Sequence, residues 1–531
     1  MRFFNSRKKK KQIQESNIPK SKISKDIKEL HVVPELEKMI ILFDTIFQKD
    51  FDFSVRKFHV FGKTEAAIVF ISSIVDKEKL ERDIIKPLQE NSRTKDLTKS
   101  MMNYINEDVL YDGDVNKTIH MKDLVEGLLR GKVVLLIDGQ KEAFHLDAFK
   151  PEKRGITQPE TERVVRGSRD GFIEQIGVNA SLLRYRLPVP EFRVEQMEVG
   201  KLTKTKLAIC YIDSITNEEL VEEVRKRIER IDIDRILDAG YIEQYIQDNP
   251  RSPFPQVQNT ERPDKAVGNI VEGRVVILID GSPFALIVPA VFNQFYQTSE
   301  DYNERWLISS IIRLIRLAAL IFSLTFSSFY VTVLSFHPEL IPAQFVVAAA
   351  SGRSGVPFPV VIEVLIMEFA MEILREATVR MPQQVGGALS IVGVLVIGQA
   401  AVLAGFVSPI TVVIIALSTI GSFATPSYNA ATAFRLLRFP LIILSGALGL
   451  LGLAAGLIIV MNHMLSIRSF GVPYMTPFSP LNITSLKDSF LRAPIKWLME
   501  RPSQLQPKDV IRENSAEKMD NPGETVNKGG N

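Results

Sequence analysis

Two aspartates follow near-identical apolar runs at separate places in the chain. "GKVVLLIDG" spans residues 131–139 and "GRVVILIDG" spans residues 273–281. A carboxylate at the end of a buried strand could act as a catalytic acid or base, which makes Asp138 and Asp280 candidates for such chemistry. Asp-Gly is also a common hairpin turn, because both residues tolerate positive φ values. No His, Cys or second acid recurs beside both aspartates, so we interpret them as structural turn residues.

"RGSRDG" (166–171) could hold a phosphate group, because glycine-rich loops present backbone N–H groups to anions. It lacks the Lys-Ser/Thr ending of a P-loop and the glycine spacing of a dinucleotide-binding fold. We therefore favour a helix that begins near Ser168 and buries Phe172, Ile176 and Leu183. The surrounding arginines alternate with acids, which is also the pattern of an intersubunit network. The candidates for such a gating or intersubunit role are Arg163, Arg166 and Arg169.

Glutamates interrupt the apolar stretch 357–382 at four positions, namely Glu363, Glu368, Glu372 and Glu376. One charge at the centre of a bilayer costs about 2.5–3.5 kcal/mol, so four cannot face lipid from one helix. The segment must lie at the interface, be buried in protein or face water. The last two glutamates can pair with Arg375 and Arg380 on the same helix. Glu363 and Glu368 have no partner four residues on, so both are candidates for a gating or intersubunit role.

Small residues dominate the stretch 385–409, in which Gln399 is a polar exception. Small residues allow close helix packing in lipid, and they could also leave open space along a pore wall. Both interpretations hold if this helix packs against copies of itself around an axis. The candidate pore-lining residues are Gly386, Ser390, Gly393, Gly398, Gln399 and Val402.

These groups belong to a chain of 531 residues in which charge and hydrophobicity are segregated. Charged residues are frequent up to residue 305, apolar residues dominate 306–467, and the remainder is polar again. The formal net charge of +3 predicts no broad nucleic-acid-binding surface. The single cysteine, Cys210, excludes an intramolecular disulfide and a zinc site made of several cysteines. We find no cofactor or metal motif, and no signal peptide after the basic run at 7–11.

The polar half contains an internal duplication. "AIVFISSI" (67–74) returns as "AICYIDSI" (208–215), at an offset that agrees within one residue with that of the Asp-Gly stretches. A charged helical stretch follows each copy. We therefore predict two copies of one α/β unit, at about 33–150 and 190–292, each with a hairpin near its end. The Pro- and Asn-rich segment 248–266 is predicted to be an irregular loop of the second copy.

The apolar half is long enough to cross a bilayer several times. The predicted spans begin near residues 306, 385, 410 and 439. The last of them is expected to run unbroken to residue 467. Arg313 and Arg316 can reach lipid headgroups and mark their end as cytoplasmic. Four crossings return the C-terminal tail to the cytoplasm but leave Arg435 and Arg438 outside. A fifth crossing by the glutamate-rich helix returns these arginines to the cytoplasm but leaves the tail outside.

Together these features predict an α/β cytoplasmic region of two duplicated subdomains followed by an all-α polytopic membrane domain. The predicted parts are a basic, disordered terminus (1–32), subdomain 1 (33–157), a connecting helical segment (158–189), subdomain 2 (190–305), a transmembrane domain of four or five helices (306–467) and a polar tail (468–531). Residues 293–305 join the second copy directly to the first membrane helix. We hypothesise that this connector passes movement into the bilayer.

Several stretches resemble the A subunit of GerA-type spore germinant receptors. They include "PETERVVRGSRDGFIEQIGVNASLLRYRL", "EDYNERW", "FHPELIP" and "REATVRMPQQVGGALSIVGVLVIGQAAVLAGFVSP". The resemblance covers about residues 60–480 in collinear order. It implies a multi-pass protein of the bacterial spore inner membrane, with its N-terminal domain in the cytoplasm. It also implies a B subunit similar to amino-acid transporters and a C subunit that is a lipoprotein.

The same resemblance implies a homo-oligomeric ring in membrane lipid that acts as a nutrient-gated ion channel and triggers germination. The residues themselves show no nucleophile–base pair or metal cluster, so we expect no enzyme activity and no cofactor, and the near-neutral charge predicts no nucleic-acid partner. Two alternatives stay open. One is a SpoVA-linked paralogue of the same family that amplifies germination ion release. The other is a secondary transporter subunit that binds nutrient itself, which would need a substrate site between inverted membrane repeats, whereas the repeat found here is cytoplasmic.

Overall fold

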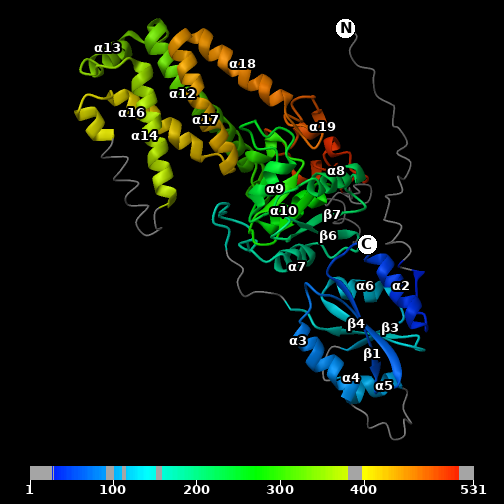
Figure 1. Cartoon of the computed structure of the whole chain (residues 1–531). Helices are drawn as coiled ribbons and strands as arrows, with labels where there is room; N and C mark the ends of the chain where they lie inside the picture. The colour runs from blue at the N-terminus through cyan, green and yellow to red at the C-terminus, as the bar shows by residue number, and fades with distance from the viewer. Residues whose placement is uncertain are drawn as a thin grey trace, which may run out of the picture.

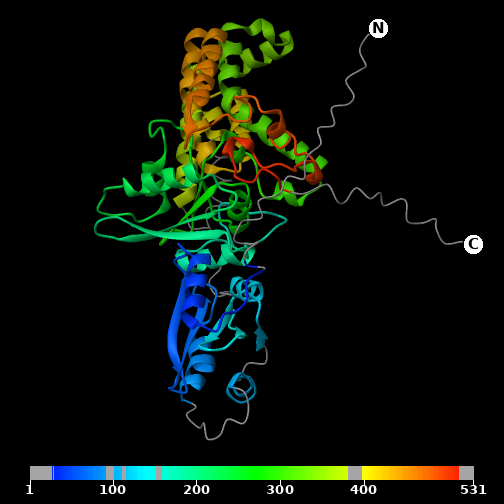
Figure 2. The same cartoon turned by 90° about the vertical axis from the view of Figure 1, so that its right-hand side faces the viewer.

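The computed structural model describes residues 27, 29–90, 101–110, 115–150, 158–380 and 398–512. Two five-stranded sheets occupy the N-terminal half, and helices occupy most of the C-terminal half. Figure 1 shows the first sheet at one end of the molecule, the second sheet in the middle and the long helices at the other end. Figure 2 shows the same three parts stacked along one long direction. The predicted order of α/β sheets followed by helices is confirmed.

The first unit is an antiparallel sheet with helices packed against it. Its strands lie in the order β1-β2-β4-β5-β3. Its elements are α2 (Leu36–Ile46), β1 (Phe53–Val60), β2 (Thr64–Ile71), α3 (Lys77–Lys79), η1 (Leu80–Ile85), α4 (Lys86–Glu90), α5 (Met101–Tyr104), η2 (Ile105–Val109), β3 (Asn116–Thr118), α6 (Met121–Leu129), β4 (Lys132–Ile137) and β5 (Ala143–Asp147).

The second unit repeats this arrangement, with strand order β6-β7-β9-β10-β8. Its elements are α7 (Ile176–Arg186), β6 (Phe192–Val199), β7 (Thr205–Ile212), α8 (Glu218–Glu229), α9 (Ala239–Ile246), β8 (Gln258–Thr260), α10 (Pro263–Val271), β9 (Val275–Ile279) and β10 (Ala285–Val288). Each strand has a counterpart at the same place in the first sheet. Two copies of one α/β unit would give this result.

The Asp-Gly pairs lie in the turns after β4 and β9, and each aspartate makes the same kind of contact with a helix start in its own unit. The Asp138 carboxylate accepts a hydrogen bond from the N–H of Leu36, the first residue of α2, at 3.1 Å. The Asp280 carboxylate accepts one from the N–H of Ile176, the first residue of α7, also at 3.1 Å. Each aspartate thus satisfies an N–H group that a helix start leaves without an intrahelical partner.

The equivalence of these two contacts makes α7 the counterpart of α2. The helix placed in the connecting segment 158–189 therefore matches the first helix of the first unit, while the domain boundary at residue 190 stays a prediction. The helix begins at Ile176 and not near Ser168. Phe172 and Leu183 are buried as expected. The start of this helix could not be predicted from the sequence, because its polar and apolar residues follow no clear helical period.

The core of the second unit explains why its central strands are apolar without interruption. Val275 and Ile277 of β9 pack into one hydrophobic cluster, together with residues of α8 and α9. Val276 and Leu278 point to the opposite face and pack with residues of α7 and α10. Successive side chains of a strand face opposite sides, so a sheet covered on both faces needs apolar residues at every position. The segment 248–266 also holds β8 and the start of α10, so its prediction as a wholly irregular loop was wrong.

The helical half begins at α12 (Trp306–Phe336) and continues with α13 (Ala343–Gly352), α14 (Val360–Arg380), α16 (Pro409–Phe423), α17 (Tyr428–Leu448) and α18 (Leu450–Ser466). Short elements flank α12, namely η3 (Phe292–Phe295), α11 (Glu300–Asn303) and η4 (Pro338–Leu340). Among the described residues, α12 and α17 are long and apolar enough to cross a membrane, while α13, α16 and α18 are shorter apolar helices.

The chain does not form the predicted unbroken span from 439 to 467. Helix α17 begins earlier, at Tyr428, and the chain reverses at Gly449, whose φ is +61°. A Cβ there would lie 2.9 Å from the ring of Phe336, so both the turn and the close packing require glycine. Helix α18 then returns along α17, with Gly452 packed against Leu444.

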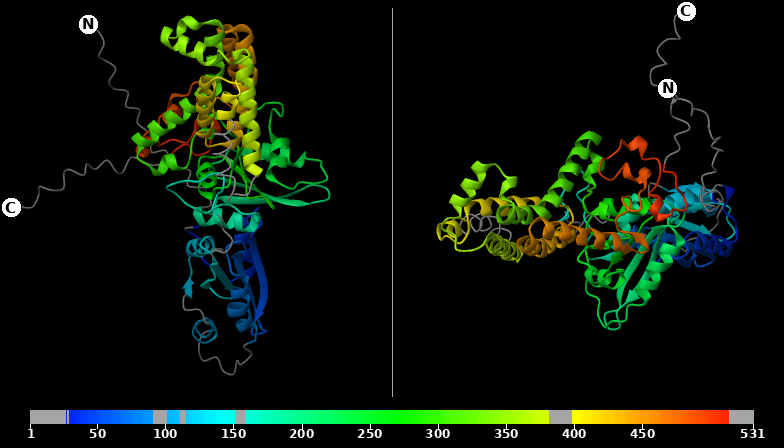
Figure 3. Two further views of the ribbon diagram at one scale, coloured as in Figure 1. Left: turned by 90° about the vertical axis from the view of Figure 1, so that its left-hand side faces the viewer. Right: turned by 90° about the horizontal axis from the view of Figure 1, so that it is seen from above.

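The tail after α18 folds back onto the second unit. It contains β11 (Arg468–Ser469), β12 (Val472–Pro473), α19 (Ile483–Leu486), η5 (Ile495–Trp497) and η6 (Ser503–Leu505). The guanidinium of Arg501 donates to the carbonyl of Val271 in α10 at 2.9 Å, and the N–H of Lys508 donates to the carbonyl of Ile215 at 2.8 Å. Figure 3 shows the tail, in orange to red, beside the second unit and the start of α12. The tail and the second unit therefore lie on the same side of the long helices.

Candidate functional site

A buried ion pair joins three long helices. The Glu368 carboxylate of α14 lies 2.6 Å from the Arg438 guanidinium of α17 and accepts a hydrogen bond from Ser327 of α12 at 2.7 Å. Arg438 also donates to Ser323 of α12 at 3.1 Å. The side chains of Glu368 and Arg438 are only 5% and 2% exposed. Because each charge is matched and hydrogen-bonded, the pair can lie among apolar helices at a tolerable cost.

A second charged group on α14 extends this polar core by one helical turn. Glu372 pairs with Arg375 at 2.6 Å and lies 3.6 Å from Arg435 of α17. Glu376 pairs with Arg380 at 2.7 Å. The pairing of these two glutamates with arginines of their own helix was predicted, and it is confirmed. Arg435 and Arg438 of α17 pair with glutamates of α14 inside the helix bundle. The positive-inside rule applies to arginines in loops, so these two do not indicate which end of α17 faces the cytoplasm.

Glu363 forms the other end of the polar core, and its side chain is fully buried. Its carboxylate lies 3.3 Å from the guanidinium of Arg353 and accepts the backbone N–H of Ser408. Ser408 is the N-cap of α16, and its hydroxyl accepts the N–H of Thr411. A carboxylate at a helix N-terminus also interacts favourably with the helix dipole. Glu363 therefore holds the start of α14 against the start of α16.

Glu363 and Glu368 are thus paired inside one chain, and neither carboxylate faces water or the outside of the subunit. The prediction looked for partners only on the same helix, and both partners come from other segments, so the sequence spacing could not show them. A gating role for the two glutamates stays a proposal. Several buried donors nearby have no hydrogen-bond partner among the described residues, namely the Nε atoms of Arg375, Arg435 and Arg438 and the hydroxyls of Ser328, Thr419 and Ser445.

The predicted pore-lining residues are only partly within the described residues. Gly386, Ser390 and Gly393 lie outside them. Gly398 is buried, and a Cβ added to it would lie 3.4 Å from Val412 of α16. Gln399 is exposed and Val402 is half-buried. Of these three positions, Gly398 serves close helix packing and Gln399 points away from the subunit.

The three arginines of the connecting loop are all exposed. Arg166 lies 3.6 Å from Glu304. Arg163 and Arg169 have no hydrogen bond or ion pair to any described residue. Glu162, just before Arg163, fixes the loop to the second unit, because it pairs with Lys265 of α10 at 2.6 Å. The structure shows a loop tied to the second unit, and it shows no phosphate cradle.

The connector between the second unit and α12 is held by a buried charge network. Asp301 lies 3.2 Å from the guanidinium of Arg313 and 3.0 Å from that of Arg316. Arg313 also pairs with Asp488 of the tail at 2.9 Å, and Tyr302 donates its hydroxyl to the same carboxylate at 2.7 Å. Burial raises the pKa of Asp488 above its ordinary value, with the charge of Arg313 opposing this shift.

These contacts correct the prediction that Arg313 and Arg316 reach out to lipid headgroups. The side chain of Arg313 is fully buried and that of Arg316 is 11% exposed. The partners were missed because Asp488 lies far along the chain, in a tail that carries no recognised motif. In the sequence, Asp488 is marked only as the single acid of the stretch 481–499.

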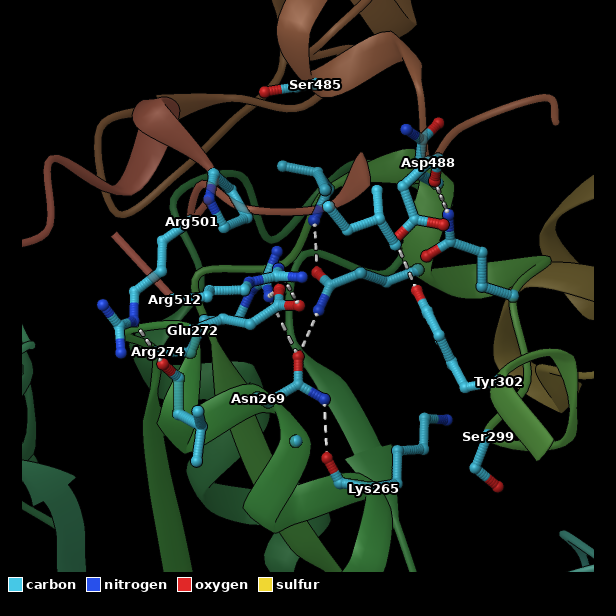
Figure 4. A pocket seen from close by; sticks show the side chains of 18 of the residues that line it. Lys265, Asn269, Glu272, Arg274, Ser299, Tyr302, Ser485, Asp488, Arg501 and Arg512 are labelled. Carbon is cyan, nitrogen blue, oxygen red and sulfur yellow. Dashed lines mark hydrogen bonds and ion pairs between the residues drawn. The ribbon is translucent and has the colours of Figure 1, made fainter. Parts of the chain in front are cut away.

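A cavity of about 820 Å³ lies where α10, the connector and the tail meet. Figure 4 shows its polar lining. Asn269 is at the centre of that network, because its side-chain oxygen accepts from Arg274 at 3.1 Å and from Gln294 at 2.8 Å. Glu272 pairs with Arg274 and also with Arg512 of the tail. The lining joins all three parts, and its positive and negative charges nearly balance.

A third charged cluster joins the two α/β units. Both carboxylate oxygens of Asp52 accept hydrogen bonds from Arg184 of α7 at 2.7 Å. Asp50 lies 3.3 Å from the same guanidinium and accepts the N–H of Val194 at 3.0 Å. Burial raises the pKa of Asp50 to about 6, with Arg184 opposing the shift and the charge of Asp52 adding to it.

Comparison with known proteins matches most of the chain. The profile of the family described as Bacillus/Clostridium GerA spore germination protein matches residues 42–504. Spore germination protein KA of Bacillus subtilis (strain 168) is 43% identical, over 84% of this chain and 82% of its own length. Spore germination protein GerLA of Bacillus cereus is 38% identical, over 86% of this chain and 93% of its own length.

Another relative, the uncharacterized membrane protein YfkQ of Bacillus subtilis (strain 168), is 38% identical over 82% of this chain and 84% of its own. Among solved structures, the N-terminal domain of the A subunit of the Bacillus megaterium spore germinant receptor GerK3 is 33% identical. It covers 49% of this chain and 97% of that chain, with a TM-score of 0.40. The resemblance drawn from the sequence motifs is confirmed, and the chain belongs to the GerA family of spore germination proteins.

Proposed function

We propose that the chain is the A subunit of a nutrient-responsive spore germination receptor and forms a ring in the membrane that acts as a nutrient-gated ion channel. The observation that carries this proposal is the polar core between α12, α14 and α17. Ionisable residues inside apolar helix bundles are costly, so they typically mark ion pathways or elements that move. The names of the related proteins support the role in germination.

The pore of this ring is lined by the small-residue stretch around residues 386–402. Within its described part, Gln399 is exposed on the subunit surface and is available to face a symmetry axis. Gly398 packs against α16 and so holds that segment in place. An amide at the axis offers both donors and acceptors to a passing ion.

Gating then depends on the charged contacts that fix α14. Glu368 ties the middle of α14 to α12 and α17, and Glu363 ties its start to α16. A rotation or shift of α12 would strain the Glu368 contact directly, because Ser327 and Ser323 of α12 bind Glu368 and Arg438. Helix α12 continues directly from the connector at 293–305, so a movement of the second unit reaches these contacts through one rigid element.

The receptor would assemble with a B subunit that resembles amino-acid transporters and a lipoprotein C subunit in the spore inner membrane. The two α/β units and the tail would lie in the cytoplasm, with several of the long helices crossing the bilayer. The B subunit would select the nutrient. An intersubunit role for Arg163, Arg166 and Arg169 stays a prediction.

The channel proposal is tested by changing Gln399 to Leu and to Trp in spores. We expect nutrient-triggered release of monovalent cations to change several-fold, with the larger side chain slowing it more. Ile420→Trp is the matched control, because Ile420 of α16 is 65% exposed and lies outside the predicted pore. Unchanged cation release in both Gln399 variants, at normal protein levels, contradicts a pore along this helix.

A further inference from the structure

The loop that carries the three exposed arginines is fixed beside the start of α12. The carboxylate of Glu300 accepts the backbone N–H groups of Val165 and Arg166, at 2.9 and 3.1 Å. The carbonyl of Arg166 accepts a hydrogen bond from Asn303 at 3.4 Å. Glu300 and Asn303 bound α11, which ends just before Trp306, the first residue of α12. The loop therefore has a defined place at the root of the first long helix.

The three arginine side chains of this loop are exposed. Val165 at its tip is 91% exposed. Arg166 has one distant ion pair, and Arg163 and Arg169 have none to any described residue. Arg305, the N-cap of α12, is also exposed, and its side chain has no hydrogen bond or ion pair among the described residues. Glu304 is the ion-pair partner of Arg166, and the carboxylate of Glu300 already accepts two backbone N–H groups.

An exposed apolar helix face begins directly after these arginines. Leu307, Ile311 and Ile315 of α12 are 56%, 58% and 60% exposed, and Trp306 is 44% exposed. The opposite face of the same turns is buried and holds Arg313. Helix α12 has 31 residues and is thus about 46 Å long, whereas the hydrocarbon core is about 30 Å thick. Its first turns therefore extend into the headgroup layer when the rest crosses the bilayer.

We propose that Arg163, Arg166, Arg169 and Arg305 form a binding surface for the phosphate groups of anionic phospholipids in the leaflet that faces the α/β units. Guanidinium groups pair with phosphate oxygens through two parallel hydrogen bonds. Each basic residue close to an anionic leaflet strengthens attachment by about fivefold. Val165 and Trp306 supply the apolar contacts between and below the headgroups.

This surface fixes the second unit at a set height and rotation above the bilayer, because the loop and α12 are joined through Glu300 and Asn303. The inference rests on one part of the proposed function, namely that α12 enters the membrane. It does not depend on the channel, the ring or the nutrient. A neighbouring copy with an acidic face is the competing occupant, and fluorescence quenching separates it from lipid.

The full-length protein is placed in vesicles with or without phosphatidylglycerol, and a fluorescent label is attached at Val165→Cys. The single native cysteine, Cys210, is buried and is replaced by serine. Quenching is measured with a nitroxide on the lipid headgroup and with iodide in the water. The control label is at Leu202→Cys, because Leu202 is 80% exposed in the turn between β6 and β7 of the same unit.

We expect headgroup quenching at Val165 to be at least twice that at Leu202 and to rise with the phosphatidylglycerol fraction. The triple variant Arg163→Gln, Arg166→Gln, Arg169→Gln should lower it to the Leu202 level. Arg235→Gln, an exposed arginine of the same unit, should leave it unchanged. Quenching by iodide alone would show a loop in water, and protection from both quenchers would show a protein neighbour; either result overturns the proposal.

A third label tests the assumption about α12 separately. Ile321→Cys lies on α12 where the side chain is 53% exposed, and brominated acyl chains should quench a label there. Quenching at Ile321 without headgroup quenching at Val165 rejects the lipid surface while α12 still enters the bilayer. Absence of quenching at both positions rejects the membrane entry of α12, and the lipid surface with it.

Discussion

The two α/β units share a strand order and a capping aspartate, yet they differ in the segments attached to them. The first unit meets the second through Asp50 and Asp52. The second unit carries that junction on α7, and its helix α10 also contacts the connector through Gln294 and the tail through Arg501. Duplication has therefore supplied two similar sheets, of which only the second is joined directly to the helical half.

The charges of the two units are placed accordingly. The core of each sheet is apolar, and the buried ion pairs lie at joints, where one part of the molecule meets another. Asp301 and its two arginines form the joint between the connector and the start of α12. Arg184 and its two aspartates form the joint between the two units. We infer that the buried ion pairs fix how the parts of the molecule are oriented relative to one another. The apolar cores of the sheets supply most of the stability of each unit.

The largest expected effect comes from breaking the joint between the connector and α12. Asp301→Ala leaves Arg313 and Arg316 buried without their shared carboxylate, which should lower the free energy of unfolding by about 4–5 kcal/mol. Lys150→Ala is the control after β5 of the first unit, where Lys150 is half-exposed and 3.9 Å from its acid. It should change stability by about 0.5 kcal/mol or less. Chemical denaturation of the detergent-solubilised chain measures both.

Equal effects of the two substitutions would mean that the buried pair at Asp301 stabilises the chain no more than an exposed pair of the first unit does. Asp301→Asn keeps the size of the side chain and removes its charge, so it separates the loss of charge from the loss of the whole side chain. It keeps one acceptor for Arg313 and removes the charge, so its effect should lie between those of Asp301→Ala and the wild-type residue.

The joint between the units should be the next most sensitive. Arg184→Met removes the cation that forms two hydrogen bonds with Asp52, and it should cost about 3 kcal/mol. The loss is smaller than at Asp301 because Asp50, with a pKa of about 6, can take up a proton and so reduce the buried charge. Trypsin cleavage between the units should become faster, while cleavage within each sheet should not change. Uniformly faster cleavage would show that Arg184 supports the second unit itself.

The sequence predicted the units far better than the joints. Repetition of "VVLLIDG" and "VVILIDG" revealed the duplication, because a buried strand and its turn constrain residue types locally. Asp52 and Arg184 are 132 residues apart, and Arg313 and Asp488 are 175 apart. Such pairs leave no periodic trace in a single sequence. Helix α7 was misplaced for a related reason, since its burial comes from tertiary packing and not from an amphipathic pattern.

The pH dependence of stability should also separate the units. The pKa of Asp50 in the folded chain, about 6, lies above its ordinary 3.8, so the folded state binds more protons between these values. Its contribution is therefore present below about pH 4 and is lost as the pH rises to about 6. The free energy of unfolding should fall across this window, and Asp50→Asn should flatten the profile there.

Glu243 provides the matching measurement in the second unit. Burial raises its pKa to about 7, and the charge of Asp238 adds to the shift. Its contribution is lost over a window that extends one unit higher than that of Asp50, so Glu243→Gln should flatten the profile up to about pH 7 while leaving the effect of Asp50 in place. A profile that neither substitution changes would place the titrating groups outside both units.

The smallest expected effects come from the capping aspartates that the two units have in common. Asp138→Ala removes the acceptor of the first N–H of α2, and Asp280→Ala removes that of α7. Each should cost about 0.5–2 kcal/mol, as for other helix caps. The two should differ in their coupling to Arg184→Met. Asp280 positions the helix that carries Arg184, so those two substitutions should be non-additive by more than about 0.5 kcal/mol, whereas Asp138 and Arg184 should be additive.

Denaturation of the three single variants and the two double variants measures this coupling. Additivity in both pairs would show that α7 holds Arg184 without help from its cap, and the two units would then differ only in the segments attached after their last strands. Nutrient response separates this structural role from acid–base chemistry. A cap that is weakened by about 1 kcal/mol leaves most of the protein folded, so the response should persist in both aspartate variants. Complete loss of response with normal stability would instead point to a chemical role that a turn residue does not have.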